Sequence, residues 1–161
     1  VNGEFAERFE SRNLDLICIL QPEPLLIRAD SRRIWRVLEN LYVNVCKYAM
    51  PGTRVYVDAI KKDGKIQLSI KNISENPLNF QADELTERFI RGDVSRSTEG
   101  SGLGLSIAKN LTVLQHGSFN IYLDGDLFKV TITFDEAVKE KKPMPPMIVP
   151  EAVQEEAQQD A

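Results

Sequence analysis

Glycines alternate with other residues in the run Gly100-Ser101-Gly102-Leu103-Gly104-Leu105, directly before an apolar helical pattern. Glycine allows the backbone to approach a ligand closely, and the free N–H groups at the start of a helix attract phosphates. The run therefore predicts an anion site, although a flexible connection has the same composition. It is not a Walker A loop, because no Gly-Lys-Ser/Thr follows. It is not a Rossmann fingerprint either, because it follows a polar loop rather than an early strand.

A second group of polar residues lies on one stripe of a predicted helix. Asn40, Asn44 and Lys47 are spaced by four and then three residues, with Tyr48 beside them. Residues at this spacing project from one side of an α-helix, so two amides and an ammonium converge. Asparagine is a mediocre helix former, which gives the pair a small propensity cost. By itself the stripe is more simply a solvated polar face, and the glycine-rich run is what favours a shared site.

Four helices are predicted from apolar periodicity. The chain should be helical to about residue 12, a long helix over residues 31–48 should begin at an Asp30 or Ser31 cap, and residues 82–89 should form a short helix. A polar loop over residues 91–102 then leads to a helix that begins at Leu103. The apolar stripes expected to face the core are Ile34, Leu38, Leu41 and Val45 on the long helix, and Leu103, Ile107, Leu111 and Leu114 on the last one.

Strands are predicted over residues 14–20 and 25–28, and in two hairpins that turn at Asp63-Gly64 and Asp124-Gly125. The hairpin strands are residues 53–60, 65–71, 118–123 and 128–134. The order of elements predicts an α/β fold, a two-layer sandwich in which helices cover one face of a mixed β-sheet. We expect one domain at 13–138, preceded by the end of a helix or a linker at 1–12. Residues 139–161, rich in Pro, Glu and Gln, should form a disordered tail.

Composition excludes several classes of protein. The net charge of −4 gives no basic face for nucleic acid, so no nucleic-acid partner is expected. No run approaches the roughly 18 apolar residues that span a bilayer, which favours a cytoplasmic domain without membrane contact. A membrane anchor elsewhere in a longer parent protein is compatible with this. Cys18 and Cys46 are far apart and indicate neither a disulfide framework nor a zinc site; both should be small buried residues.

Three segments together resemble the motifs of one family. The segment NLYVNVCKYA at 40–49 resembles the N box of bacterial sensor histidine kinases, ERFIRGD at 87–93 their F box, and GSGLGLSIAKNL at 100–111 their second glycine box. The resemblance covers roughly residues 14–134, with the motifs in the family's order. It implies a Bergerat-type ATP fold that binds ATP and Mg²⁺. The γ-phosphoryl group would pass to a phosphoacceptor histidine on a separate domain of the same kinase, with a response regulator as an indirect partner.

The same resemblance assigns roles to individual residues. Asn44 would coordinate the Mg²⁺ that bridges the ATP phosphates, supported by Asn40, while Lys47 would contact phosphate oxygens. Tyr48 would pack on the adenine or ribose, and the glycine loop from Gly100 to Leu105 would hold the phosphates. Arg91 and Arg96 fall in the lid that closes over ATP, where a guanidinium stabilises charge on the transferring group. Both are equally well explained as solvated loop charges.

The first glycine box of the family departs from its pattern in this chain. The family has Asp-x-Gly-x-Gly, whose Asp accepts a hydrogen bond from the adenine amino group. Here Asn72 takes the place of the Asp, and both glycines are missing. A neutral acceptor contributes about 0.5–1.5 kcal/mol against roughly 1.5–3 for a charged one, so ATP affinity should fall about tenfold. An alternative is a degenerate or anti-sigma-type module that acts by partner interaction.

Transfer is favoured over hydrolysis by one position on the long helix. Related ATPases carry a Glu one turn before the metal-binding Asn to activate water, and Asn40 occupies that place here. An amide is no general base at neutral pH, and Glu39 points about 100° away. His116, the only histidine, lies at a helix end, where imidazole is favourable, and is not expected to be the acceptor. The domain alone should therefore bind ATP without phosphorylating itself.

Overall fold

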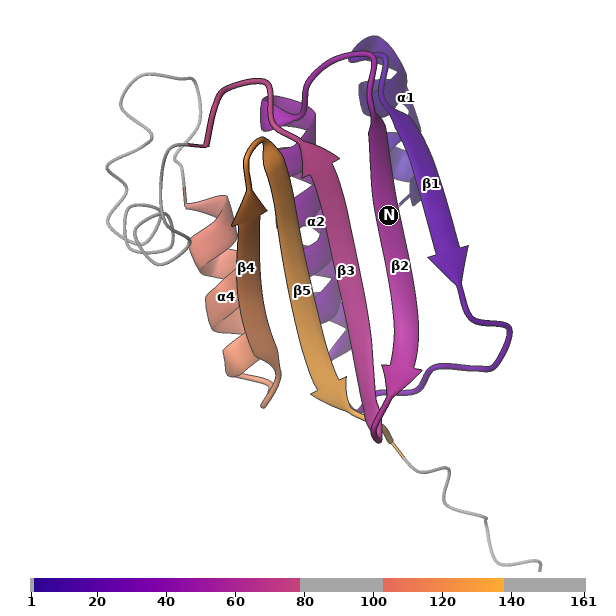
Figure 1. The fold of residues 1–161 in the computed structure, drawn as a ribbon. Coiled ribbons are helices and arrows are strands. Elements are labelled where there is room, and N and C mark those ends of the chain that lie inside the picture. The colour runs from indigo at the N-terminus through magenta and orange to yellow at the C-terminus, as the bar shows by residue number, and fades with distance from the viewer. Residues whose placement is uncertain (1, 79–102, 138–161) are drawn as a thin grey trace, which may run out of the picture.

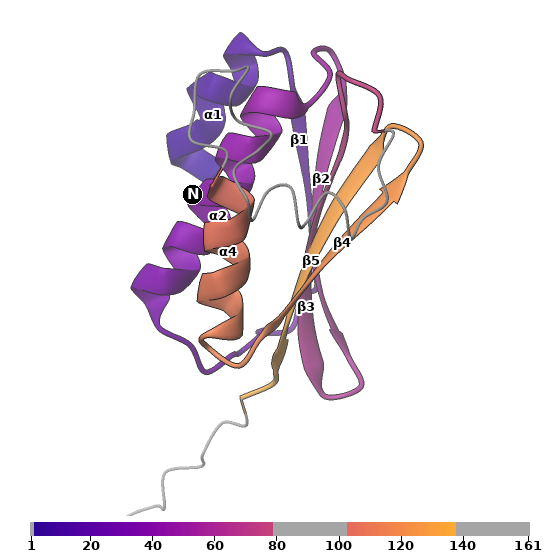
Figure 2. The ribbon, with the colours of Figure 1, turned by 90° about the vertical axis from the view of Figure 1, so that its left-hand side faces the viewer.

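The computed structural model describes residues 2–78 and 103–137. These residues form two layers, with the helices packed on one face of a five-stranded sheet (Figure 1, Figure 2). The predicted α/β two-layer sandwich is confirmed. The helices are α1 (Asn2–Ser11), α2 (Ser31–Tyr48) and α4 (Gly104–Val113), and the strands are β1 (Asp15–Leu20), β2 (Arg54–Lys62), β3 (Lys65–Ile73), β4 (Ser118–Asp124) and β5 (Leu127–Asp135). The helix, loop and tail predicted at 82–89, 91–102 and 139–161 lie outside the described residues.

The sheet is mixed and has the strand order β1-β2-β3-β5-β4. Strand β1 runs parallel to β2, and the other neighbouring pairs are antiparallel. Both predicted hairpins are present. Asp63 and Gly64 form a two-residue turn with φ of 51° and 72°, the left-handed geometry that Asp-Gly favours in tight hairpins. The turn between β4 and β5 is Gly125-Asp126, with Gly125 at φ 56°.

The apolar side of α2 faces the sheet, but its centre is shifted from the predicted stripe. Leu41 and Val45 are buried as expected, whereas Ile34 and Leu38 are only half-buried. Val37, which is 0% exposed, and Tyr42 complete the buried side. Helix α1 covers α2 at Tyr42. The rings of Phe5 and Phe9 each meet the Tyr42 ring edge-on, with centroids 5.5 Å apart in both pairs.

The predicted strand at residues 25–28 is wrong. Of these residues only Ile27 pairs, in an isolated antiparallel bridge with Glu136, while Leu26 accepts one further hydrogen bond from Ala137. The segment follows Pro22 and Pro24, which lack the backbone N–H that a ladder requires. The connection from β1 to α2 is therefore irregular over most of its length.

The predicted core face of the last helix is only partly correct. Leu111 packs against the core and Ile107 is half-buried, whereas Leu103 and Leu114 are 41% and 60% exposed. The fully buried side of α4 carries Leu105, Ala108 and Thr112. Thr112 is fully buried, and its hydroxyl is satisfied there because it donates to the Ala108 carbonyl oxygen at 2.8 Å. A count of apolar residues does not detect a buried polar residue of this kind.

Two further findings concern the surface. Cys18 is exposed on β1 and Cys46 is half-buried, so the expectation that both are buried is wrong. Strand β1 lies at the edge of the sheet, where one side of a strand faces solvent.

Over residues 2–78 and 103–137, none of the helices has the length and apolar character needed to cross a membrane.

Candidate nucleotide site

The start of α2 is fixed by a cap and by a side chain that follows α4. The Asp30 carboxylate accepts a hydrogen bond from the Arg33 N–H at 3.0 Å, which lowers the pKa of that carboxyl. The Asp30 N–H donates to Gln115 Oε1 at 2.8 Å, and Gln115 Nε2 donates to the Leu111 carbonyl at 2.8 Å. Of the two predicted caps, Asp30 is therefore the one used. The bridge through Gln115 ties the C-terminal end of α4 to the N-terminal end of α2.

Asn40 and Gly104, far apart in the sequence, lie in contact where α2 passes the start of α4. Asn40 Nδ2 donates to the Arg36 carbonyl of its own helix at 2.7 Å, which leaves Oδ1 directed toward Gly104. A Cβ built on Gly104 would lie 3.3 Å from that oxygen and 3.8 Å from the Asn40 carbonyl oxygen. The close approach therefore depends on glycine. It brings the polar stripe of α2 to the start of α4, which lies at the end of the glycine-rich run.

The other residues of the polar stripe are accessible to a ligand. Asn44 and Tyr48 are half-buried, and Lys47 is exposed in the last turn of α2. The Tyr48 carbonyl accepts a hydrogen bond from the Glu75 N–H at 2.8 Å, so the end of α2 is fastened to the chain that follows β3. The stripe thus runs from the start of α4 to the end of β3.

Asn72 lies near the end of β3, paired with Phe128 of β5, and its side chain is buried at 3% exposure. Its Nδ2 donates to the Ile73 carbonyl at 3.2 Å. Its Oδ1 has no hydrogen-bond partner among the described residues. A buried amide oxygen without a partner costs about 1–3 kcal/mol, which is unusual in a folded core. The described residues thus leave the hydrogen-bonding capacity of this oxygen unused.

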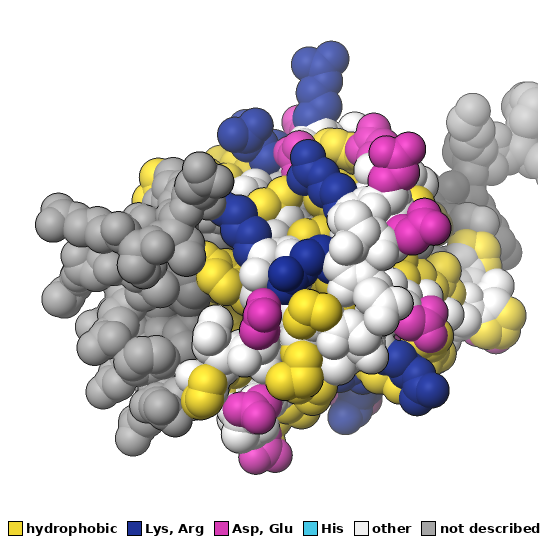
Figure 3. All heavy atoms as spheres, turned by 90° about the horizontal axis from the view of Figure 1, so that it is seen from above, with side chains coloured by type: hydrophobic (Ala, Val, Ile, Leu, Met, Phe, Trp, Pro, Cys, Tyr) yellow, Lys and Arg dark blue, Asp and Glu magenta, His cyan; other side chains and the backbone are white. Residues whose placement is uncertain are grey.

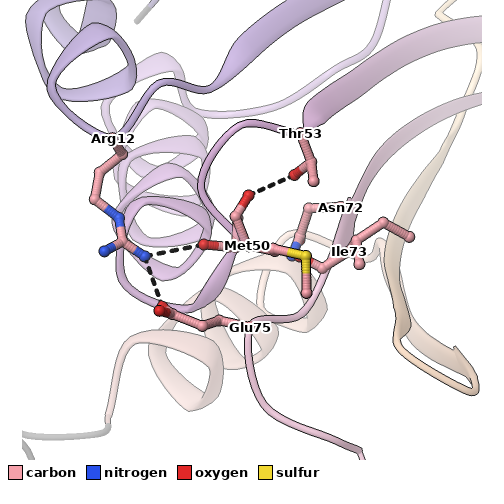
Figure 4. A network of polar contacts seen from close by, with 7 residues as sticks. Arg12, Met50, Thr53, Asn72, Ile73 and Glu75 are labelled. Carbon is pink, nitrogen blue, oxygen red and sulfur yellow. Dashed lines mark hydrogen bonds and ion pairs between the residues drawn. The ribbon is translucent and has the colours of Figure 1, made fainter.

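A set of hydrogen bonds beside Asn72 holds the end of β3 against α2 and the residue that follows α1 (Figure 4). One guanidinium nitrogen of Arg12 donates to the Ala49 carbonyl and to the Glu75 carboxylate, both at 2.9 Å. The Ile73 carbonyl also accepts from the Met50 N–H at 2.8 Å. Sequence reasoning missed Arg12, because nothing in the local pattern signals a contact so distant along the chain.

The described part of the glycine-rich run begins at Leu103. Leu103 accepts hydrogen bonds at its carbonyl from the Ile107 N–H at 2.9 Å and the Ser106 hydroxyl at 2.8 Å, in the first turn of α4. Leu105 is buried in the core and anchors this turn. Gly100, Ser101 and Gly102 lie outside the described residues, as do Arg91 and Arg96.

Viewed from above, the end of the molecule that holds the end of β3 carries basic and acidic side chains interspersed with apolar ones (Figure 3). No group of three or more His, Cys, Asp and Glu is placed to bind a metal within residues 2–78 and 103–137.

The family described as histidine kinase-, DNA gyrase B-, and HSP90-like ATPase matches residues 29–138, which is more than half of the chain. The chain belongs to this family. Its match begins just before Asp30 and includes α2, the β2–β3 and β4–β5 hairpins and α4. The contact between Asn40 and Gly104 therefore lies inside a nucleotide-binding domain of this family.

Relatives of this family member are sensor kinases. It is 32% identical over 117 residues to the signal transduction histidine-protein kinase BaeS of Escherichia coli, a match that covers 71% of this chain and 25% of BaeS. It is 31% identical over 144 residues to the sensor histidine kinase WalK of Bacillus subtilis, covering 84% of this chain and 23% of WalK. The chain thus spans about a quarter of the length of these relatives.

Solved structures show the same fold. The catalytic domain of histidine kinase ThkA has a TM-score of 0.72 at 23% identity, covering 84% of this chain and 87% of that one. Full-length ShkA in complex with AMPPNP has a TM-score of 0.69 at 20% identity, covering 84% and 28%. ThkA in complex with the response regulator protein TrrA has a TM-score of 0.66 at 21% identity, covering 84% and 38%.

Proposed function

We propose that this domain binds ATP with Mg²⁺ and delivers the γ-phosphoryl group to a histidine on a separate helical domain of the same kinase. The observation that carries the proposal is the contact of Asn40 with Gly104, which joins the polar stripe of α2 to the start of α4. The free N–H groups of a helix start attract phosphate. The sensor kinases to which the chain is similar, and the ShkA complex with AMPPNP, support a nucleoside triphosphate as the ligand.

The residues at the phosphate end fit Mg²⁺ held largely by the nucleotide. Mg²⁺ keeps an octahedral shell of oxygens and usually takes only one or two from the protein, the rest coming from phosphates and water. The half-buried Asn44 would offer one amide oxygen, with Asn40 beside the start of α4. Lys47 would contact phosphate oxygens. The bound ion would neutralise charge that develops on the transferring group.

At the base end, Asn72 and Tyr48 are the groups we assign to the adenine. The buried Asn72 Oδ1 is an acceptor without a partner among the described residues, and the adenine amino group is a donor. Tyr48 is half-buried at the end of α2 and offers an aromatic surface for the base or ribose. The bonds from Arg12 to Ala49 and Glu75 hold the neighbouring backbone in place.

The residue types at positions 39 and 40 favour transfer over hydrolysis. Hydrolysis needs a general base to activate water, and Asn40 is an amide. Glu39 is exposed on α2, whereas Asn40 faces Gly104. The acceptor would be the histidine domain of the same kinase, and a response regulator would take the group afterwards. The complex of ThkA with the response regulator protein TrrA supports such a partner. A domain in this role would lie in the cytoplasm.

Isothermal titration of MgATP tests the proposal. The wild-type domain should bind MgATP with a Kd in the micromolar to sub-millimolar range, and Asn44→Ala should weaken binding only when Mg²⁺ is present. Asn120→Ala is a matched control, because it makes the same chemical change at an exposed residue of β4. The absence of heat at millimolar MgATP, or equal binding by Asn44→Ala and the wild type, would show the proposal to be wrong.

A further inference from the structure

The buried side chain at position 72 differs in kind from a carboxylate. A carboxylate offers two acceptors, whereas an asparagine amide offers one acceptor and one donor group, which exchange places when the amide turns by 180°. In the structure Nδ2 donates to the Ile73 carbonyl and Oδ1 has no partner among the described residues. In this orientation the side chain presents an acceptor.

Turning the amide would break only a weak bond. The distance from Asn72 Nδ2 to the Ile73 carbonyl oxygen is 3.2 Å, at the long end of the range for N–H···O bonds. The same carbonyl oxygen keeps a shorter bond, from the Met50 N–H at 2.8 Å, so it would not be left without a donor. The turned amide would bring Oδ1 toward this carbonyl oxygen, which is unfavourable and makes the observed orientation the preferred one.

The two orientations suit different purine bases. Adenine carries an amino group at its position 6, which donates to an acceptor, whereas guanine carries an oxygen there, which accepts from a donor. Resting on the proposed function, we propose that Asn72 lets the domain accept guanine as well as adenine nucleotides. Oδ1 accepts from the adenine amino group in the observed orientation, and Nδ2 donates to the guanine oxygen in the turned one.

The size of the preference follows from these contacts. ATP keeps an advantage, since GTP requires the turned amide, whose Oδ1 then faces the Ile73 carbonyl oxygen. The new bond from Nδ2 to the guanine oxygen offsets part of this cost, and we expect the Kd for MgGTP to exceed that for MgATP by about tenfold or less. A tenfold ratio corresponds to about 1.4 kcal/mol. An aspartate at position 72 has no donor in either orientation and would repel the guanine oxygen. Asn72→Asp should therefore widen the ratio to roughly a hundredfold or more, because the carboxylate would face the guanine oxygen with no donor bond to offset the repulsion.

The test compares the Kd values of MgATP and MgGTP for the wild type, Asn72→Asp and Asn120→Asp by isothermal titration. Asn120 is exposed on β4, so its variant makes the same change in charge outside the core and outside the proposed site. The inference requires a small ratio in the wild type and in Asn120→Asp, and a widened ratio in Asn72→Asp. A wild-type ratio above about a hundredfold overturns it, and so does an unchanged ratio in Asn72→Asp that retains the wild-type circular dichroism spectrum.

A measurement on the wild type alone covers the case in which Asn72→Asp does not fold. Purine riboside triphosphate has only hydrogen at position 6 and should bind more weakly than both MgATP and MgGTP. Equal affinity for all three would overturn the inference, because position 6 would not be read. If ATP binds and GTP does not, only this inference fails. If neither nucleotide binds, the proposed function fails with it.

Discussion

The substitution Gly104→Ala perturbs the place where the two halves of the phosphate end meet. The added methyl group would lie 3.3 Å from Asn40 Oδ1, closer than an ordinary van der Waals contact, so the amide must move by a few tenths of an ångström. Asn40 Nδ2 is held by the Arg36 carbonyl at 2.7 Å, so the amide cannot move without straining that bond. We expect Asn40 to lose one contact with bound MgATP.

The expected change in stability is the balance of helix propensity and steric strain, and the expected change in affinity comes from the lost contact. In a helix, alanine is more favourable than glycine by roughly 0.5–1 kcal/mol, which offsets the steric strain, so the free energy of unfolding should change by less than about 1 kcal/mol. Loss of one neutral contact of about 0.5–1.4 kcal/mol raises the Kd for MgATP by about two- to tenfold. Affinity should fall while stability is nearly unchanged.

Titration calorimetry and urea unfolding measure the two quantities separately. Gly3→Ala is the matched control, since Gly3 lies in α1 and a Cβ there would have no neighbouring atom within 4 Å. It should stabilise the protein without altering affinity. Wild-type affinity in a folded Gly104→Ala variant would refute the assignment of Asn40 and Gly104 to the phosphate end.

Three further outcomes are expected. Gly117→Ala should destabilise the protein by about 1–3 kcal/mol in urea unfolding, because its Cβ would lie 2.6 Å from the Phe134 ring; wild-type stability would contradict this packing. Burial raises the pKa of Tyr42 to about 12, so the folded state should lose stability as pH rises from 10 to 12, and less so in Tyr42→Phe. Equal pH profiles would contradict that cause. Glu39→Gln should leave any slow ATP hydrolysis unchanged in a phosphate-release assay, and its loss would identify Glu39 as a water-activating base.

The elements that sequence reasoning predicted correctly depend on local chemistry. Asp30 begins α2 because its carboxylate reaches the Arg33 N–H within the same turn. Asp63-Gly64 forms a hairpin turn because both residues adopt positive φ. Such contacts span a few residues and leave a signature in the sequence. The strand predicted at 25–28 is absent because the prolines before it, which cannot donate to a ladder, outweigh the short apolar run.

Contacts between distant segments could not be predicted in the same way. Three motifs indicated that Asn40 and Gly104 belong to one site. How closely the two residues approach, leaving little room for a methyl group between them, depends on how α2 and α4 pack. The buried Thr112 and the covering of Tyr42 by α1 likewise depend on the tertiary structure. The buried state of Asn72 and its Oδ1 without a partner among the described residues became visible only in three dimensions.

The position of β1 at the edge of the sheet has a consequence for aggregation. An edge strand is a template for another chain, and the exposed Ile19 and Leu20 at its end would favour such pairing. Strand β1 has six residues, and Pro22 and Pro24 come shortly after it. Prolines cannot donate to a growing ladder, so they limit how far this edge can extend. The same prolines that interrupt a strand at 25–28 thus also shorten the edge with which a second chain could pair.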